Sequence, residues 1–211
     1  MIGILVRQKK LAVDAPAPVA AWRDPKDPRH AITVDNLLGM NSGIEFGQSL
    51  YSDWHSAFDP SAQMQFDVAD QAAFAETAEL GAAPGTRWNY TNGNTMLLAR
   101  MIRDQAGGDA SSVLRFAHRE LFDKLGMEHV TLEFDSAGTP IGSSHMWASA
   151  RDWARDIQQN AFHACSSVRT IRILRSASRR RSQRGWLLAL ACWYEEPGCS
   201  AHSAAKLGLR V

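Results

Sequence analysis

Tyr90 and Asn92, in the run Pro-Gly-Thr-Arg-Trp-Asn-Tyr-Thr-Asn over residues 84–92, are the side chains of this sequence best suited to chemistry. A tyrosine phenol can take up a proton and return it when a neighbouring lysine ammonium ion lowers its pKa. An asparagine amide can donate a hydrogen bond to a substrate carbonyl and accept another through its oxygen. The pair therefore suits acid–base chemistry on a carbonyl compound.

A three-letter pattern also has structural interpretations. Asn92 or Asn94 could cap the helix that follows, because asparagine is favoured at that position. Tyr90 could be one more ring packed against Trp88. Both interpretations stay open at this point, and capping and catalysis can coexist in Asn92.

The helix that would position this pair has the strongest pattern in the chain. Over residues 94–106, an apolar face recurs at helical spacing, and Gly107-Gly108 supplies a C-cap. Thr33 and either Ser111 or Ser112 are expected to cap further helices. Residues 48–65 show no period and predict a long surface excursion. Helices are expected over residues 2–7, 33–40, 67–80, 94–106, 111–121 and 149–156, and one strand over 130–134.

Four stretches resemble the β-lactamase and penicillin-binding-protein family of serine hydrolases, and they follow one another along the chain in the family's order. Residues 84–92 resemble the Tyr-x-Asn box of class C β-lactamases, D-peptidases and related esterases. The other three resemble members of the group that includes the 6-aminohexanoate-oligomer hydrolases. They are residues 32–38 with Asn41-Ser42-Gly43, residues 121–127, and residues 143–153.

The resemblance implies an α/β (α+β) fold in which helices flank an antiparallel sheet and a mostly helical subdomain carries the Tyr-x-Asn box. Residues 1–156 would form a partial domain of this kind, mainly the helical subdomain with little sheet. The implied reaction is cleavage of a small-molecule amide or ester through an acyl-serine intermediate. Tyr90 and Asn92 would be the catalytic residues, and neither a metal nor a cofactor is implied.

The nucleophile is the part of the family pattern that does not match. The family's Ser-x-x-Lys is expected upstream of Met1, ahead of a helix whose end resembles residues 3–11. Ser203-Ala-Ala-Lys206 follows Tyr90 instead of preceding it, and we interpret it as a chance match. The chain as written is therefore expected to be a truncated and inactive hydrolase, so its status as an enzyme is left open.

The charge reverses along the chain. Residues 1–156 hold 20 acidic and 14 basic side chains, net −6, whereas residues 157–211 hold 2 acidic and 9 basic ones, net +7. The second segment also has all three cysteines, in no zinc-binding pattern. We expect it to be a disordered or out-of-frame tail and not a nucleic-acid-binding arm. The alternatives for the whole chain are a non-catalytic remnant or binding protein and, less favoured, a nucleic-acid-binding protein.

Other features bound the function only loosely. No signal peptide and no apolar stretch of membrane-spanning length is visible, which predicts a soluble protein, cytoplasmic by default or periplasmic for a complete parent. The histidines lack metal-ligand spacing. His145 stands where relatives often have an aromatic residue, so no role is assigned to it. The family allows a substrate-binding role for Tyr51, Trp54 or Asp59, which the sequence does not decide.

Overall fold

The computed structural model describes residues 1–46 and 59–156 of the chain. These residues belong to two compact units, which we describe separately. Of the described residues, the first unit comprises 1–46, 59–124 and 128–148, and the second comprises 125–127 and 149–156.

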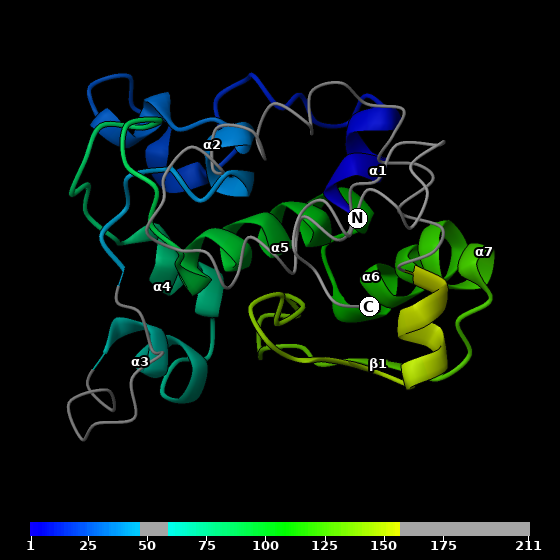
Figure 1. Ribbon diagram of the computed structural model, residues 1–211. Helices are drawn as coiled ribbons and strands as arrows, with labels where there is room; N and C mark the ends of the chain where they lie inside the picture. Colours follow the sequence, from blue (N-terminus) through cyan, green and yellow to red (C-terminus); the bar gives the residue numbers. More distant parts are fainter. Residues whose placement is uncertain (47–58, 157–211) are drawn as a thin grey trace, which may run out of the picture. The chain divides into compact units, whose positions relative to one another are not determined.

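Helix α5 (Asn92–Ala106) is the central element of the first unit (Figure 1). It contacts α1 (Ile2–Arg7), α2 (Val34–Leu38), α4 (Gln71–Glu76) and α6 (Ala110–Ala117). Because neighbours cover several of its sides, α5 buries more than the single face that the sequence predicts. Its buried apolar residues are Met96, Leu97, Leu98, Ala99, Met101 and Ile102.

Side-chain caps explain where the helices begin. Thr33 caps α2 as predicted, in a reciprocal capping box with Asn36. The caps predicted for α6, Ser111 or Ser112, were wrong. Asp109 caps this helix by accepting a hydrogen bond from the Ser112 backbone N–H. The cap therefore lies two residues before Ser111, and the Asp109 carboxylate adds a favourable charge at the helix N-terminus.

The predicted excursion over residues 48–65 is wrong for its last part. Residues Pro60–Phe66 form α3, in which Asp59 is the N-cap and proline occupies the first turn. The helix expected over 67–80 is correspondingly shorter, since α4 begins only after its own cap, Asp70. Short helices of six or seven residues bury too few positions to show a clear period in the sequence.

Residues 118–124 and 128–148 of the first unit add less regular elements. A π-helical turn, η4 (His118–Phe122), extends α6. The predicted strand is β1 (Val130–Leu132), which pairs antiparallel with β2 (Met146–Ala148) so that Thr131 lies opposite Trp147. The sequence missed β2, because three residues that alternate between half-buried and exposed are too few to give a pattern.

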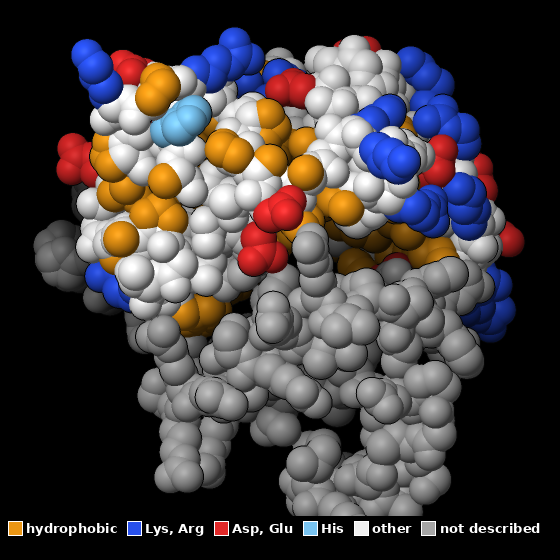
Figure 2. All heavy atoms as spheres, turned by 90° about the horizontal axis from the view of Figure 1, so that it is seen from above, with side chains coloured by type: hydrophobic (Ala, Val, Ile, Leu, Met, Phe, Trp, Pro, Cys, Tyr) orange, Lys and Arg blue, Asp and Glu red, His pale blue; other side chains and the backbone are white. Residues whose placement is uncertain are grey.

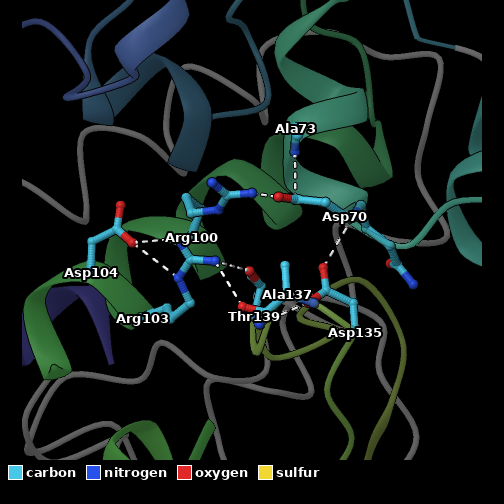
Figure 3. Close-up of polar contacts among 9 residues, drawn as sticks. Asp70, Ala73, Arg100, Arg103, Asp104, Asp135, Ala137 and Thr139 are labelled. Carbon is cyan, nitrogen blue, oxygen red and sulfur yellow. Dashed lines mark hydrogen bonds and ion pairs between the residues drawn. The ribbon is translucent and has the colours of Figure 1, made fainter. Parts of the chain in front are cut away.

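An ionic clamp joins α4 to α5 and to the loop at 135–139 (Figure 3). Asp70 accepts a hydrogen bond from the Ala73 backbone N–H at 2.9 Å and pairs with the Arg100 guanidinium on α5. Asp135 accepts from the Gln71 backbone N–H at 3.0 Å, so the loop is tied to the start of α4. Arg103 completes the clamp by donating to Ala137 O and Thr139 Oγ1.

Charged side chains are unevenly spread over the molecular surface. In the view of Figure 2, Lys and Arg gather mainly on the side where α1 and α6 lie, opposite a more apolar side. Three cations surround one carboxylate of the first unit, since Glu120 lies 2.8 Å from Lys124 Nζ, 3.1 Å from Arg119 Nε and 3.9 Å from Arg7. The bonds from Lys124 and Arg119 hold the pKa of Glu120 below its ordinary value.

The described part of the second unit is small. Residues 150–156 are helical, as the sequence predicts, and the helix starts where Ser149 Oγ accepts from the Asp152 backbone N–H. Arg155 pairs with Asp152 at 3.1 Å and donates to the carbonyl oxygen of Gly126. Within the described residues of the chain, no helix is long and apolar enough to cross a membrane.

Candidate active site

The turn that leads into the Tyr-x-Asn box is held by the segment at residues 40–43. The Gly85 N–H donates to Asn41 O and the Asn89 N–H donates to Met40 O, each at 2.7 Å. Gly85 has a φ of +81°, which glycine adopts without the steric cost that other residues meet. Two of the four family-like stretches, residues 41–43 and 84–92, thus lie side by side.

Gly43 makes the close approach of these two segments possible. Its carbonyl oxygen accepts from the backbone N–H groups of Gly81 and Ala82 at 2.9 and 3.3 Å. Its φ is +84°, and a Cβ at this position would lie only 2.1 Å from Ala82 O. A side chain at position 43 would therefore push the segment at residues 40–43 away from Ala82, which lies just before the turn that leads into the box.

Tyr90 lies at the surface, with 40% of its area exposed, directly before the N-cap of α5. Among the aromatic pairs of the described residues, none joins Tyr90 to Trp88. The Tyr90 ring thus forms no aromatic pair with Trp88 among these residues, and both interpretations of Tyr90 stay open. An exposed phenol beside a helix start is free to meet a second reactant, which proton transfer requires.

Asn92 is the first residue of α5 and not its cap, which corrects the capping interpretation. Thr91 is the N-cap, and its hydroxyl oxygen accepts from the Gly93 backbone N–H at 3.2 Å. The Asn92 side chain instead donates through Nδ2 to Ser61 Oγ at 2.8 Å. This bond uses one hydrogen of the amide group, which also has a second N–H and an acceptor oxygen, Oδ1.

Asn94, the other residue considered as a cap, is fully buried. Its Oδ1 accepts from Ser42 Oγ at 2.7 Å, and its Nδ2 lies 3.4 Å from the sulfur of Met40. Asn94 therefore ties the first turn of α5 to the segment that supports the box. Sequence reasoning missed this role, and the only available signal was a second asparagine inside an otherwise apolar face.

Helix α3 connects the box to the last family-like stretch. Gln65 Nε2 donates to Ser144 Oγ at 2.9 Å and to Ser143 Oγ at 3.3 Å. Ser144 Oγ in turn lies 2.7 Å from His145 Nδ1, and the His145 ring packs edge-on against Trp147. His145 thus lies in a cluster of hydrogen-bonded polar side chains, and no role in a reaction is assigned to it.

The remaining candidates divide into two groups. Asp59 has a structural role, because its carboxylate accepts from the Ser61 backbone N–H at 2.8 Å as the cap of α3. Tyr51, Trp54, Ser203 and Lys206 lie outside the described residues. Within the part of the chain that the structure describes, no three His, Cys, Asp or Glu side chains are grouped so that they could hold a metal ion.

The fold agrees with what family comparison finds. The profile of the Beta-lactamase family matches residues 1–191. The chain therefore belongs to the β-lactamase family, a family of serine hydrolases. The match runs past residue 156 into the basic segment, so the division between 1–156 and 157–211 stays a prediction from composition.

A solved structure is similar over most of this chain. A provisionally named 6-aminohexanoate-dimer hydrolase from Bacillus anthracis gives a TM-score of 0.60 at 21% sequence identity. The match covers 76% of this chain and 44% of that one, so this chain spans less than half of the neighbour's length. At this identity the likeness shows the fold, and it confirms the predicted helix-rich fragment of the β-lactamase fold. A search of curated proteins finds no match.

Proposed function

We propose that this chain carries the acid–base part of a serine hydrolase that cleaves amide or ester bonds through an acyl-serine intermediate. The serine oxygen attacks the substrate carbonyl carbon, and the Tyr90 phenolate takes the hydroxyl proton. Collapse of the tetrahedral intermediate forms the acyl-serine, and the same phenol returns the proton to the leaving group. The observation that carries this proposal is the exposed phenol at the start of α5, in a chain of the β-lactamase family.

Asn92 has the second role in this scheme. With one amide hydrogen bonded to Ser61, its other hydrogen can donate to the substrate carbonyl, and Oδ1 can accept from a lysine ammonium group. That lysine would also favour the phenolate form of a tyrosine within about 4–6 Å. Asn92 thus connects substrate and lysine from a rigid helical position.

The proposal needs a serine and a lysine, and residues 1–89 do not supply them as a Ser-x-x-Lys sequence. The same observation favours a second candidate function, binding of an amide or ester without turnover. In either case we expect a small molecule and not a nucleic acid as the ligand. A DNA titration at several salt concentrations should therefore show no salt-dependent binding.

The decisive test joins a relative's Ser-x-x-Lys segment, and its C-terminal sheet segment, to residues 1–156. Tyr90→Phe in this restored enzyme should lower kcat for a p-nitrophenyl ester by roughly 10²–10⁴, the usual size of a general acid–base contribution. Trp88→Phe serves as the matched control and should keep kcat within about threefold, since its ring has no part in proton transfer. Near-full activity of the Tyr90→Phe enzyme would refute the role of Tyr90.

A further inference from the structure

Ser61 and Asn92 are 31 positions apart in the sequence and belong to different helices, yet their side chains share a 2.8 Å hydrogen bond. Ser61 has no exposed surface, so its hydroxyl is placed by the fold and not by solvent. Its backbone is fixed as well, because its N–H donates to Asp59 at the cap of α3. The acceptor that meets Asn92 is therefore rigid.

A buried acceptor of this kind constrains an amide more than a surface one. Leaving a buried hydroxyl without its hydrogen-bond partner costs free energy. The side-chain orientation of Asn92 that makes this bond is therefore favoured over rotated ones. Since an asparagine donates only through nitrogen, the bond also determines which way Oδ1 points. Within the described residues, the Asn92 amide nitrogen donates to Ser61.

The same face of α3 carries a second polar anchor. Gln65 lies one helical turn after Ser61, and residues four apart share a face of a helix. Gln65 donates to Ser144 and Ser143, so α3 is held at this end by the turn that carries His145. The position of Ser61 is thus set from both sides, by its own cap and by this anchor.

We propose that Ser61 is the positioning residue of Asn92: its buried hydroxyl takes one amide hydrogen and so presents Oδ1 and the second N–H of Asn92 for the reaction. This inference rests on the proposed function for the role of Asn92, but the geometry it asserts exists without turnover. Ser61 touches no reacting atom in this scheme and acts through Asn92 alone.

The test follows the Asn92 side-chain amide in the ¹⁵N-labelled 211-residue chain, where the Asn92→Ala spectrum identifies its signals. In the unsubstituted chain the two amide hydrogens should differ, with the one bonded to Ser61 exchanging more slowly with solvent. Ser61→Ala should speed that exchange by about fivefold, as expected for loss of one hydrogen bond of ordinary strength. Ser61→Thr, which keeps a hydroxyl, should restore slow exchange.

Ser143→Ala is the matched control, because it removes a hydroxyl that contacts Gln65 and not Asn92. It should leave both Asn92 amide signals unchanged. If Ser61→Thr does not fold, as a thermal melt would show, Ser61→Cys replaces it and should give exchange between that of serine and alanine. Unchanged Asn92 signals in a folded Ser61→Ala chain would overturn the inference. Because this readout needs no catalysis, its failure is distinct from retained activity in Tyr90→Phe, which refutes the proposed function.

Discussion

Thr91 is the N-cap of α5, so substitutions at this position should change the stability of the fold. Thr91→Ala removes the acceptor of the Gly93 N–H and should lower the free energy of unfolding by about 1 kcal/mol, the usual cost of a lost N-cap. Thr91→Ser keeps the acceptor and should stay within a few tenths of a kcal/mol. Urea unfolding measures both, and equal losses in the two variants would contradict the assignment of Thr91 as the cap.

Gly93 and Gly3 form a matched pair of helical glycines with opposite expectations. A Cβ at Gly93 would lie 3.1 Å from Cγ of Phe46, whereas one at Gly3 would meet nothing within 4 Å. Gly3→Ala should raise the free energy of unfolding by roughly 0.5–1 kcal/mol, because alanine is the better helix former. Gly93→Ala should lower it by about 1 kcal/mol, since crowding of a packed ring costs more than the propensity returns. Thermal melts would contradict this packing if both substitutions stabilised the chain.

At the scale of elements, the clamp between α4 and α5 should make stability depend on pH. Burial opposes ionisation of Asp70, but the bonds from the Ala73 N–H and the Arg100 guanidinium outweigh it and hold the pKa of Asp70 below its ordinary value. A carboxyl group with a lowered folded-state pKa stabilises the fold above its unfolded-state pKa, about 3.9. This stabilisation is lost as the pH falls through the folded-state value.

Asp70→Asn should therefore lower the free energy of unfolding at pH 7 and flatten its decline below about pH 4. The asparagine keeps an oxygen for the Ala73 N–H, so the helix cap is retained while the charge is lost. Urea unfolding between pH 2.5 and 7 measures the slope. Asp67→Asn, three residues earlier at the C-cap of α3, is the control and should leave the slope nearly unchanged. Identical slopes for Asp70→Asn and the unsubstituted chain would show that the clamp does not contribute.

At the scale of the whole molecule, the 211 residues by themselves should not turn over substrate. The proposed scheme needs a Ser-x-x-Lys sequence, and residues 1–89 contain none. Nitrocefin and p-nitrophenyl acetate should be hydrolysed at the rate of the buffer control, with and without Tyr90→Phe. Turnover that survives Ser203→Ala and is lost in Tyr90→Phe would show that another serine of this chain is the nucleophile.

The local parts of this protein could be predicted from its sequence. The central helix, the Thr33 cap and the helix after Ser149 follow from spacing and cap chemistry, which act between residues a few positions apart. The β-lactamase family could also be predicted, because four ordered stretches carry it. The sequence did not show α3 or β2, since elements this short take their stability from neighbours and not from their own pattern.

Tertiary structure alone decided how the candidate site is supported. Ser61 reaches Asn92, Ser42 reaches Asn94, and the carbonyl groups of residues 40 and 41 hold the turn before Tyr90. These contacts join residues roughly 30 to 50 positions apart, at separations where no local spacing rule applies. The sequence determined which side chains could do chemistry. The packing of helices around α5 determined which of them are capped, buried or left exposed, because each hydrogen bond depends on an atom that the chain brings close only after it folds.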